Sequence, residues 1–521
     1  MDTKALRQKI LDLAIRGKLV PQDPDDEPAS VLLERIRQQK QQMVKEGKLK
    51  PKDIKNDSVI FAGEDNLHYE KFSDGSVKCI EDEIPFDLPE GWAWVRLGNL
   101  SAAIQYGLSN SAEPQGTHRL LRITDIQDGK VDWNAVPFTT VNDPEAYLLK
   151  TGDIVFARTG ATVGKSFLIT ETPYPSVYAS YLIRIRLLGS LSPEYIYQFF
   201  DSACYWSQIT DKSVGVGQPN CNGTSLKELF IPLPPISEQL RIVPTAQALL
   251  AYVAKIDAEK KSLLSIIMAT KSKILGLAIR GQLVPQDPAD EPASVLLERI
   301  RAEKEELIKQ GKIKRDKKES FIFRGEDNSY YEKVDMEVRC INSEIPFDLP
   351  ETWCWCRLGT LFAHNTGKAL NSADSAGTPM TYITTSNLYW DRFELDSLKE
   401  MLFADSEIDK CTVKKGDLLV CEGGDIGRSA IWMFEENIRI QNHIHRLRPY
   451  ISLSGRFYYY VMYMWKHLGL IGGQGIGLQG FSSKMLHNLI VPLPSIDEQE
   501  RIVAFIDKLF EPIESIEKSL S

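Results

Sequence analysis

The sequence lacks the features that mark membrane-spanning and secreted proteins. No run approaches 18 uncharged apolar residues, which excludes a transmembrane helix. The first residues, Met1-Asp2-Thr3-Lys4, contain no apolar signal-peptide stretch. The eight cysteines are scattered through 521 residues without a CxxC pair, so a disulfide framework is not indicated. We therefore expect a cytoplasmic protein with free thiols.

Catalytic signatures are also missing. The sequence has no GxSxG, HExxH, catalytic-cysteine or GxGxxG pattern. Residues 160–166, GATVGKS, approach a phosphate-binding loop, but three residues instead of four separate the glycines, and strand-like sequence follows. His443 and His445 alternate along a predicted strand, where a polar strand face is favoured over a zinc pair. The sequence thus predicts neither a catalytic nor a metal site.

Composition is that of an ordinary globular protein, with 43% hydrophobic and 26% charged residues. The length suggests three or four domains. A net charge of −9 is unfavourable for binding phosphates. However, residues 92–235 contain 11 basic and 12 acidic side chains, and residues 353–495 contain 14 and 13. The acidic excess lies outside these two segments, so charge alone does not exclude a nucleic-acid partner.

An internal repeat organises the whole chain. Residues 10–40 recur at 274–304 with five differences, EIPFDLPEGWAWVRLG (83–98) recurs as EIPFDLPETWCWCRLG, and IPLPPISEQLRIV (231–243) recurs as VPLPSIDEQERIV. Between these shared stretches, residues 99–225 and 360–485 share little beyond length and a few glycines. Cys354 and Cys356 correspond to Ala93 and Val95, which argues against a metal role. A common frame therefore presents two different inserts.

The frame is cyclic, because joining the C-terminal tail to the N-terminal helix would regenerate the central segment. Mixed three-and-four apolar spacing predicts a long central helix over 245–280, packed antiparallel against a composite of 1–17 and 497–520. Pro244 should kink or restart this helix, and Gly17 and Gly281 should end the equivalent helices. Further helices are expected at 28–47 and 292–311, each followed by a charged linker.

The two inserts carry short β-rich runs punctuated by glycine, which predict mixed α+β domains. The expected strands are 153–157, 166–170 and 181–187 in the first insert, and 417–421 and 438–447 in the second. The predicted fold is thus α+β, with two mixed domains joined by long antiparallel helices in a pseudo-two-fold cyclic repeat. The segments are an N-terminal helix 1–20, a helical linker 21–91, domain 92–235, central helix 236–283, the repeated linker 284–352, domain 353–495 and C-terminal helix 496–521.

Glycine-rich turns in the inserts expose polar side chains that suit base recognition. In the major groove, Arg pairs with guanine and side-chain amides pair with adenine. The turn at 158–165 would expose Arg158, Thr159 and Lys165, and its counterpart would expose Glu422, Asp425 and Arg428. The candidate DNA-contacting residues are Gln105, Tyr106, Arg158, Thr159, Lys165, Gln218, Asn220, Arg428, Gln441, Asn442, His443, Gln474 and Gln479. Glycine-stabilised turns and ordinary polar loops are the alternative interpretation of the same residues.

With its doubled PLP-x-I-x-EQ-x-RIV ending and its cyclic half-repeat, the chain resembles the specificity subunit of Type I restriction–modification systems over nearly its whole length. The resemblance implies that 92–235 and 353–495 are target recognition domains, each reading half of an asymmetric bipartite DNA sequence. Two modification (methyltransferase) subunits and two restriction subunits would be partners. S-adenosylmethionine, ATP and Mg²⁺ would bind those partners, so no cofactor is expected on this chain. A nucleoid-associated location in a prokaryote would follow from DNA binding.

The helical frame would dock the modification subunits and set the spacing of the two half-sites at about one DNA turn, roughly 34 Å. The candidate partner-contacting residues are Leu6, Ile10, Leu240, Leu250, Val253, Ile267, Ile502 and Ile506. Two other hypotheses compete with this one. The first is a coiled-coil scaffold that presents two protein-binding domains, and the second is a nucleotide-dependent hydrolase centred on 160–166.

Overall fold

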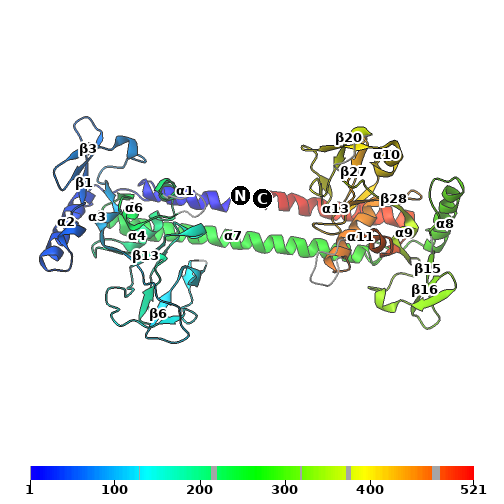
Figure 1. The fold of residues 1–521 in the computed structure, drawn as a ribbon, viewed down its shortest axis with the longest axis horizontal. Coiled ribbons are helices and arrows are strands. Elements are labelled where there is room, and N and C mark those ends of the chain that lie inside the picture. The colour runs from blue at the N-terminus through cyan, green and yellow to red at the C-terminus, as the bar shows by residue number, and fades with distance from the viewer. Residues whose placement is uncertain are drawn as a thin grey trace. The chain divides into compact units, whose positions relative to one another are not determined.

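The computed structural model describes residues 2–127, 129–212, 220–316, 319–370, 377–471 and 481–520. The chain divides into two compact units, Met1–Lys260 and Lys261–Ser521. The helix α7 (Ile236–Ala278) begins in the first unit and ends in the second. Each unit contains one copy of the sequence repeat, and Figure 1 shows the same kinds of element in both.

The helices of the shared frame form where the apolar spacing predicts them. They are α1 (Thr3–Ile15) and α2 (Ala29–Lys45) in the first unit, and α8 (Ala293–Lys309) and α13 (Ile496–Leu520) in the second. Gly17, Gly47, Gly281 and Gly311 follow α1, α2, α7 and α8 with φ between 64° and 73°. This left-handed conformation favours glycine, so the predicted helix ends are confirmed.

The predicted restart of the central helix at Pro244 is wrong, because α7 is helical without interruption from Ile236. An interior proline costs about 3 kcal/mol. Close packing on both sides of this position, where Ile242 and Ala246 are fully buried, offsets that cost. Only the backbone bond to the carbonyl of Leu240, four residues earlier, has to be given up.

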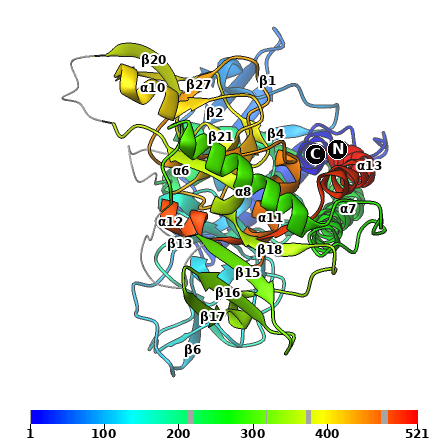
Figure 2. The same cartoon turned by 90° about the vertical axis from the view of Figure 1, so that its right-hand side faces the viewer.

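Antiparallel helix pairs form within each unit, as the cyclic repeat predicts. In the first unit, Thr3 donates to Asp257 at 3.1 Å, and Ile10 packs with Ala246 and Val253. In the second, the Lys271 ammonium lies 2.7 Å from Glu517, and α7 and α13 lie side by side in Figure 2. The apolar residues between the paired helices are thus buried by the chain itself.

The prediction of charged linkers after α2 and α8 is wrong, because each of these segments forms a three-stranded antiparallel sheet. The first consists of β1 (Ser58–Ala62), β2 (His68–Phe72) and β3 (Val77–Cys79). The second consists of β15 (Ser320–Arg324), β16 (Tyr330–Val334) and β17 (Glu337–Cys340). Their high charge hides the alternation that would otherwise have indicated strands.

A four-stranded antiparallel sheet forms the centre of each divergent domain. The first has the order β11-β10-β13-β5, with bounds Ser166–Leu168, Ile154–Ala157, Leu182–Leu187 and Ser101–Tyr106. The second has the order β26-β25-β28-β19, with bounds Ser429–Ile431, Leu418–Cys421, Ile444–Pro449 and Phe362–Thr366. The domains therefore share a topology that their sequences barely show.

A second sheet in each domain contains one parallel strand pair. It has the order β12-β6-β9 in the first unit, with bounds Ser176–Tyr178, His118–Leu121 and Phe138–Thr139. In the second unit the order is β23-β20-β27-β24, with bounds Lys399–Phe403, Thr378–Ile383, Ile438–Ile440 and Thr412–Val413. The single strand predicted over 438–447 is thus two strands, β27 and β28, in different sheets.

Short elements complete each domain. The strand pairs are β4–β14 (Ala93–Arg96, Phe230–Leu233), β18–β29 (Cys354–Arg357, Ile490–Leu493), β7–β8 (Ile126–Gln127, Lys130–Val131) and β21–β22 (Leu388–Tyr389, Arg392–Phe393). The helices are α3 (Leu97–Leu100), α4 (Pro193–Phe199), α5 (Ala203–Lys212), α6 (Gly223–Lys227), α9 (Leu358–Leu361), α10 (Asp405–Cys411), α11 (Gly455–His467) and α12 (Ser483–His487). This mixture confirms the predicted fold class.

Candidate nucleic-acid interface

The glycine turn of the first unit connects two antiparallel strands, β10 and β11, as predicted. Gly160 and Gly164 have φ values of 72° and 88°. A Cβ on Gly164 would lie 2.5 Å from the Trp206 ring on α5, so the turn lies against that helix. Because a strand follows Lys165 where a phosphate loop needs a helix, the structure does not support the nucleotide-hydrolase hypothesis.

Backbone pairing brings four separate segments of the first unit together at this turn. The Arg158 N–H donates to the Tyr181 carbonyl at 3.1 Å, and the Arg158 carbonyl accepts from Cys221 N–H at 3.0 Å. Thr159 forms an isolated antiparallel bridge with Asn220. The guanidinium of Arg158 lies 4.9 Å from the ring centroid of Tyr106, the last residue of β5. Four sequence-predicted residues, 106, 158, 159 and 220, are therefore neighbours.

The side chains of this cluster differ in their availability to a ligand. Asn220 and Lys165 are exposed, and Arg158 is half-buried with a buried Nε atom that has no hydrogen-bond partner in the described structure. Tyr181, at the entrance of β13, is 63% exposed and was not predicted. Gln105 differs, because its amide oxygen accepts from the buried Arg184 at 2.7 Å. That contact gives Gln105 an internal partner.

The second unit assembles the same four segments in the same way. The Glu422 N–H donates to the His443 carbonyl at 2.9 Å, and the Phe481 N–H donates to the Glu422 carbonyl at 2.9 Å. Gln441 bridges Lys368 after β19, and the Asn442 N–H donates to the Lys368 carbonyl at 2.9 Å. Glu422 thus takes the backbone place of Arg158, and His443 takes the place of Tyr181.

The two units therefore carry opposite charges at one equivalent position, Arg158 in the first and Glu422 in the second. The His443 ring is 56% exposed, with Nδ1 3.7 Å from the carboxylate of Glu422. Arg428, the counterpart of Lys165, lies 4.9 Å from the Tyr389 ring centroid and donates to the Thr385 carbonyl. Its Nε, like that of Arg158, is buried without a hydrogen-bond partner in the described structure. Gln218, Gln474 and Gln479 lie outside the described residues.

The prediction that His443 and His445 lie on one polar strand face is wrong, because His445 is fully buried. Its Nε2 donates to the Phe481 carbonyl at 2.8 Å, and its Nδ1 lies 3.0 Å from Nε2 of His364. In the neutral state, Nδ1 of His445 accepts a hydrogen bond from the Nε2–H of His364. Burial and the His445 neighbour lower the pKa of His364 to about 3, and burial lowers the pKa of His445.

The corresponding pair in the first unit is apolar. Arg186 on β13 pairs with Asp153, and Arg448 on β28 pairs with Asp417. Aligning these two ion pairs aligns β13 with β28, and Arg184 then corresponds to Arg446. The registers then place Ile183 where the second unit has His445, and Ile104 where it has His364. The two sites thus differ both at their surfaces and in the core that supports them.

The repeated EQ-x-R motif holds each domain to the frame. The Trp92 indole N–H donates to Glu238 at 2.8 Å in the buried interior, and Arg241 forms an ion pair with Asp26 before α2. Both contacts recur in the second unit, Trp353 with Glu498 at 2.8 Å and Arg501 with Asp290 at 2.6 Å. Burial raises the pKa of Glu238 and of Glu498. The motif therefore fixes the divergent domain against its helix.

The predicted partner-contacting residues separate into two groups. Five are at most 7% exposed and belong to the chain's own packing: Ile10, Val253, Ile267, Ile502 and Ile506. Leu6 and Leu240 are exposed, and Leu250 is half-buried. Periodicity identifies an apolar helix position but does not distinguish an intramolecular seam from a docking face. Exposed apolar side chains that the prediction missed on α7 include Leu249, Tyr252, Ile256, Leu263, Ile266 and Met268.

Within the described ranges, no group of three His, Cys, Asp or Glu side chains is placed to hold a metal ion. In the same part of the chain, no helix is long and apolar enough to cross a membrane. The fold does bring the same four segments together in both units, with different side chains at equivalent positions. This arrangement is that of two similar domains with unlike surfaces on a common scaffold.

Comparison with known proteins identifies the family. Residues 89–266 and 350–521 match the model of the Type I restriction modification DNA specificity domain, so the chain belongs to this family. It is 25% identical to the Type I restriction enzyme EcoAI specificity subunit of Escherichia coli, over 98% of this chain and 89% of that one. It is 30% identical to the EcoEI specificity subunit of Escherichia coli, over 69% and 62% of the two chains.

A solved structure supports the fold. A chain from a structure of the type I R-M system has a TM-score of 0.54 to this one at 19% identity, covering 84% of this chain and 94% of that chain.

Proposed function

We propose that this chain is the non-catalytic DNA specificity subunit of a Type I restriction–modification complex, and that each unit reads one half of a bipartite, asymmetric target. The observation that carries the proposal is the equivalent convergence of four loops in both units, with different side chains at equivalent positions. Arg158 suits guanine, whereas Glu422 suits the amino group of cytosine. Two unlike faces on one scaffold fit two unlike half-sites.

The near-identical frames fit two copies of one partner. We propose that modification subunits dock on the frame of each unit, and that restriction subunits join that assembly. The exposed apolar side chains of α7 support such a contact, because solvated helices seldom carry so many. S-adenosylmethionine, ATP and Mg²⁺ would be bound by these partners. The partners would also supply part of the contacts to DNA phosphates, because the two recognition domains are near neutral in charge.

Selection of bound duplexes from a randomised pool tests this proposal. The chain is assembled with its modification subunit, and the recovered sequences are compared with those of Arg158→Ala and Glu422→Gln. Each variant should relax one base position in a different half-site, at a cost of about 1–3 kcal/mol. Lys55→Ala, at an exposed position outside the recognition face, is the control and should leave the sequence unchanged. Identical sequences from all the variants would refute this assignment of the face.

A further inference from the structure

The three-stranded sheet after α2 has one solvent-facing side with an unusual composition. The strand registers place Val59, Phe61, Tyr69, Lys71, Val77 and Cys79 on that side. Val59, Phe61 and Val77 are 49%, 40% and 53% exposed, and the rings of Phe61 and Tyr69 stack at 5.9 Å. Free apolar surface of this kind on a sheet indicates a binding site.

The sheet after α8 repeats this side with one substitution, because Phe321 stands at the position of Val59 and the other five residues are identical. The equivalent positions are Phe321, Phe323, Tyr331, Lys333, Val338 and Cys340. Phe321 stacks on Phe323 and Phe323 on Tyr331, each pair at 5.9 Å, and Phe321 remains 43% exposed. The recognition faces diverge between the units, whereas this aromatic face is preserved. A preserved face fits the same kind of partner in both units.

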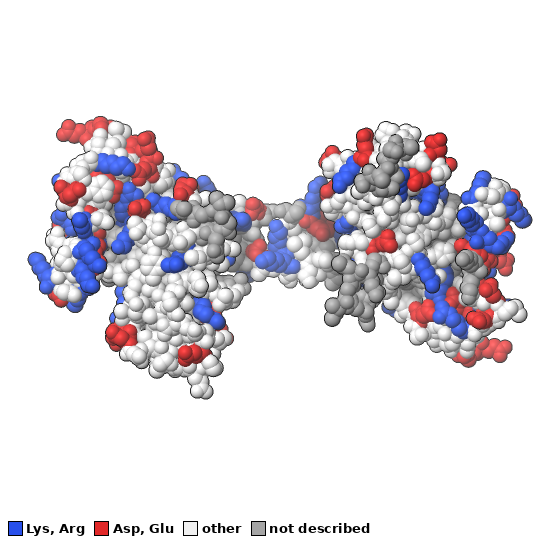
Figure 3. Space-filling model, viewed as in Figure 1, with Lys and Arg blue, Asp and Glu red and all other residues white. Residues whose placement is uncertain are grey.

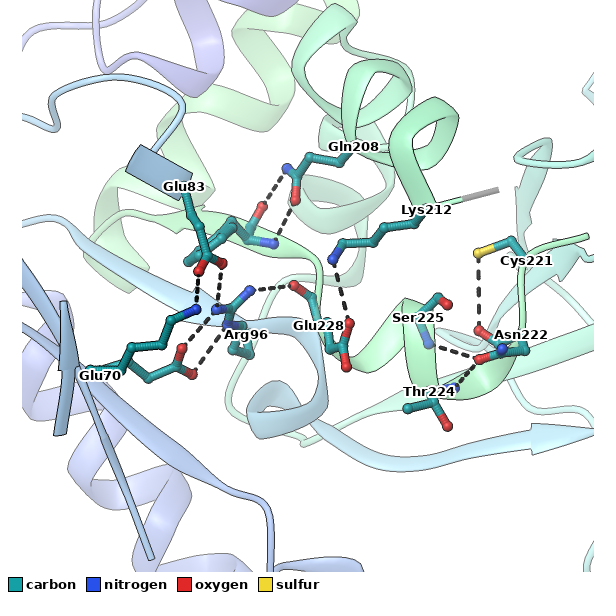
Figure 4. Close-up of polar contacts among 12 residues, drawn as sticks. Glu70, Glu83, Arg96, Gln208, Lys212, Cys221, Asn222, Thr224, Ser225 and Glu228 are labelled. Atoms are coloured by element: carbon teal, nitrogen blue, oxygen red, sulfur yellow. Dashed lines mark hydrogen bonds and ion pairs between the residues drawn. The ribbon is translucent and has the colours of Figure 1, made fainter. Parts of the chain in front are cut away.

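The opposite side of each sheet is fixed to the recognition domain. Glu70 on β2 is 3% exposed and accepts two hydrogen bonds from Arg96 on β4, at 3.1 and 2.7 Å (Figure 4). The Arg96 guanidinium also lies 3.7 Å from the Phe230 ring centroid on β14. Glu332 and Arg357 repeat the bidentate pair at 2.8 Å. A partner on the aromatic face would thus be held rigidly relative to the domain that reads DNA.

The charge of the two segments that carry these sheets disfavours a polyanion as the partner. Residues 21–91 contain 17 acidic and 10 basic side chains, and residues 284–352 contain 17 and 12. Figure 3 shows acidic side chains gathered around the β1–β3 sheet. The strand-connecting turns carry Glu64, Asp65 and Asp74 in one unit and Glu326, Asp327 and Asp335 in the other. An apolar face bordered by carboxylates fits a protein whose own apolar patch is bordered by Lys and Arg.

We infer that the aromatic faces of these two sheets, Val59–Cys79 and Phe321–Cys340, are docking sites for two modification subunits, one on each unit. The inference rests on the proposed function and specifies where the partner binds. Rigid connection of the sheet to the recognition domain places the methyl-transferring partner at a fixed distance from the base that is read. It adds a contact to the one that the exposed side chains of α7 provide.

Two native cysteines report on this contact directly. Cys79 and Cys340 lie on the two faces and are exposed, whereas the other six cysteines are buried or half-buried. N-ethylmaleimide alkylation, followed by peptide mass spectrometry, is compared for the chain alone, with DNA, and with modification subunit. We expect the modification subunit to slow alkylation of both cysteines about tenfold or more, and DNA alone to leave both rates unchanged. Unchanged rates in a complex that still methylates DNA would overturn the inference without affecting the proposed function.

A matched pair of variants separates the face from general stability. Phe321→Ser removes an exposed ring of the face and should weaken binding of the modification subunit to the second unit about tenfold. Met336→Ser removes a 91% exposed side chain from the turn beside it and should have no effect. Equal binding by both variants would overturn the inference, and so would protection of Cys79 and Cys340 by DNA instead of by protein. Absence of any complex or methylation would instead overturn the proposed function on which the inference rests.

Discussion

The buried histidine pair predicts that the two units respond differently to acid. Protonation of His364 adds a proton at its Nδ1 and places a positive charge on a half-buried ring next to His445. Protonation of His445 instead places the proton on its Nδ1, facing the Nε2–H of His364, and breaks the hydrogen bond between the two rings. The neighbouring charged groups are Glu422, His443, His487 and Arg446. His364 titrates near 6.5 when unfolded and at about 3 when folded. Since the folded pKa is lowered, the neutral pair stabilises the fold above pH 6.5, and this stability is lost as the pH falls towards 3.

The size of the effect follows from this pKa difference. At pH 5 the unfolded imidazole is about 1.5 pH units below its pKa while the folded one remains neutral, which corresponds to about 2 kcal/mol at 1.36 kcal/mol per unit. For a unit of this size, that loss lowers the melting temperature by about 4–8 °C. Residual solvent contact of His364 makes this an upper limit.

The double variant His364→Ile/His445→Ile copies the pair of the first unit and provides the control. Its stability at pH 7 will be lower, because the Phe481 carbonyl loses its donor, but its dependence on pH between 7 and 5 should be weaker than that of the natural chain. Differential scanning calorimetry at several pH values measures both slopes. Equal slopes for the two proteins would refute the assignment of the acid sensitivity to this pair.

Two further predictions concern single side chains of the first unit. Gly164→Ala should destabilise the glycine turn and weaken recognition of one half-site, because its Cβ would meet Trp206. Gly160→Ala meets no atom within 4 Å and should cost only about 1–2 kcal/mol for its positive φ. Duplex selection and urea unfolding distinguish the two variants, and equal effects of both would contradict the contact with Trp206. Trp92→Phe should cost about 1–3 kcal/mol in urea unfolding by leaving buried Glu238 without its donor, and a stability unchanged at pH 7 would show that this hydrogen bond does not hold the domain to α7.

The repeat made much of the frame predictable from sequence. Two copies of each helix signal, such as Gly17 with Gly281, identify a helix end more reliably than one copy does. The β10–β11 turn was predictable because the glycine spacing and the strand-like sequence that follows Lys165 exclude a phosphate loop. The residues around Arg158 were recognisable as polar loop residues, but their convergence depends on strand pairing between distant segments, which periodicity does not specify.

Other features were not accessible from the sequence. The repeat predicted that the helices carrying Ile10 and Val253 pack together, but only the packing shows that these two side chains lie between the helices and not on a docking face. The sheet after α2 was missed because Glu70 and Arg96 form a buried ion pair where strand patterns usually have apolar residues. His445 was assigned to a surface because histidine is most often polar and exposed, whereas here it replaces Ile183 of the other unit.

The central claim is that each unit reads its own half of one DNA target. The most direct measurement is methylome sequencing of a host without adenine methylation that expresses this chain together with its modification subunit, before and after residues 92–235 are exchanged for those of a relative. The account predicts a bipartite motif with a fixed gap that requires both proteins, and an exchange that changes one half and leaves the other half intact. A motif that changes in both halves, or no new methylation from a verified complex, would contradict it.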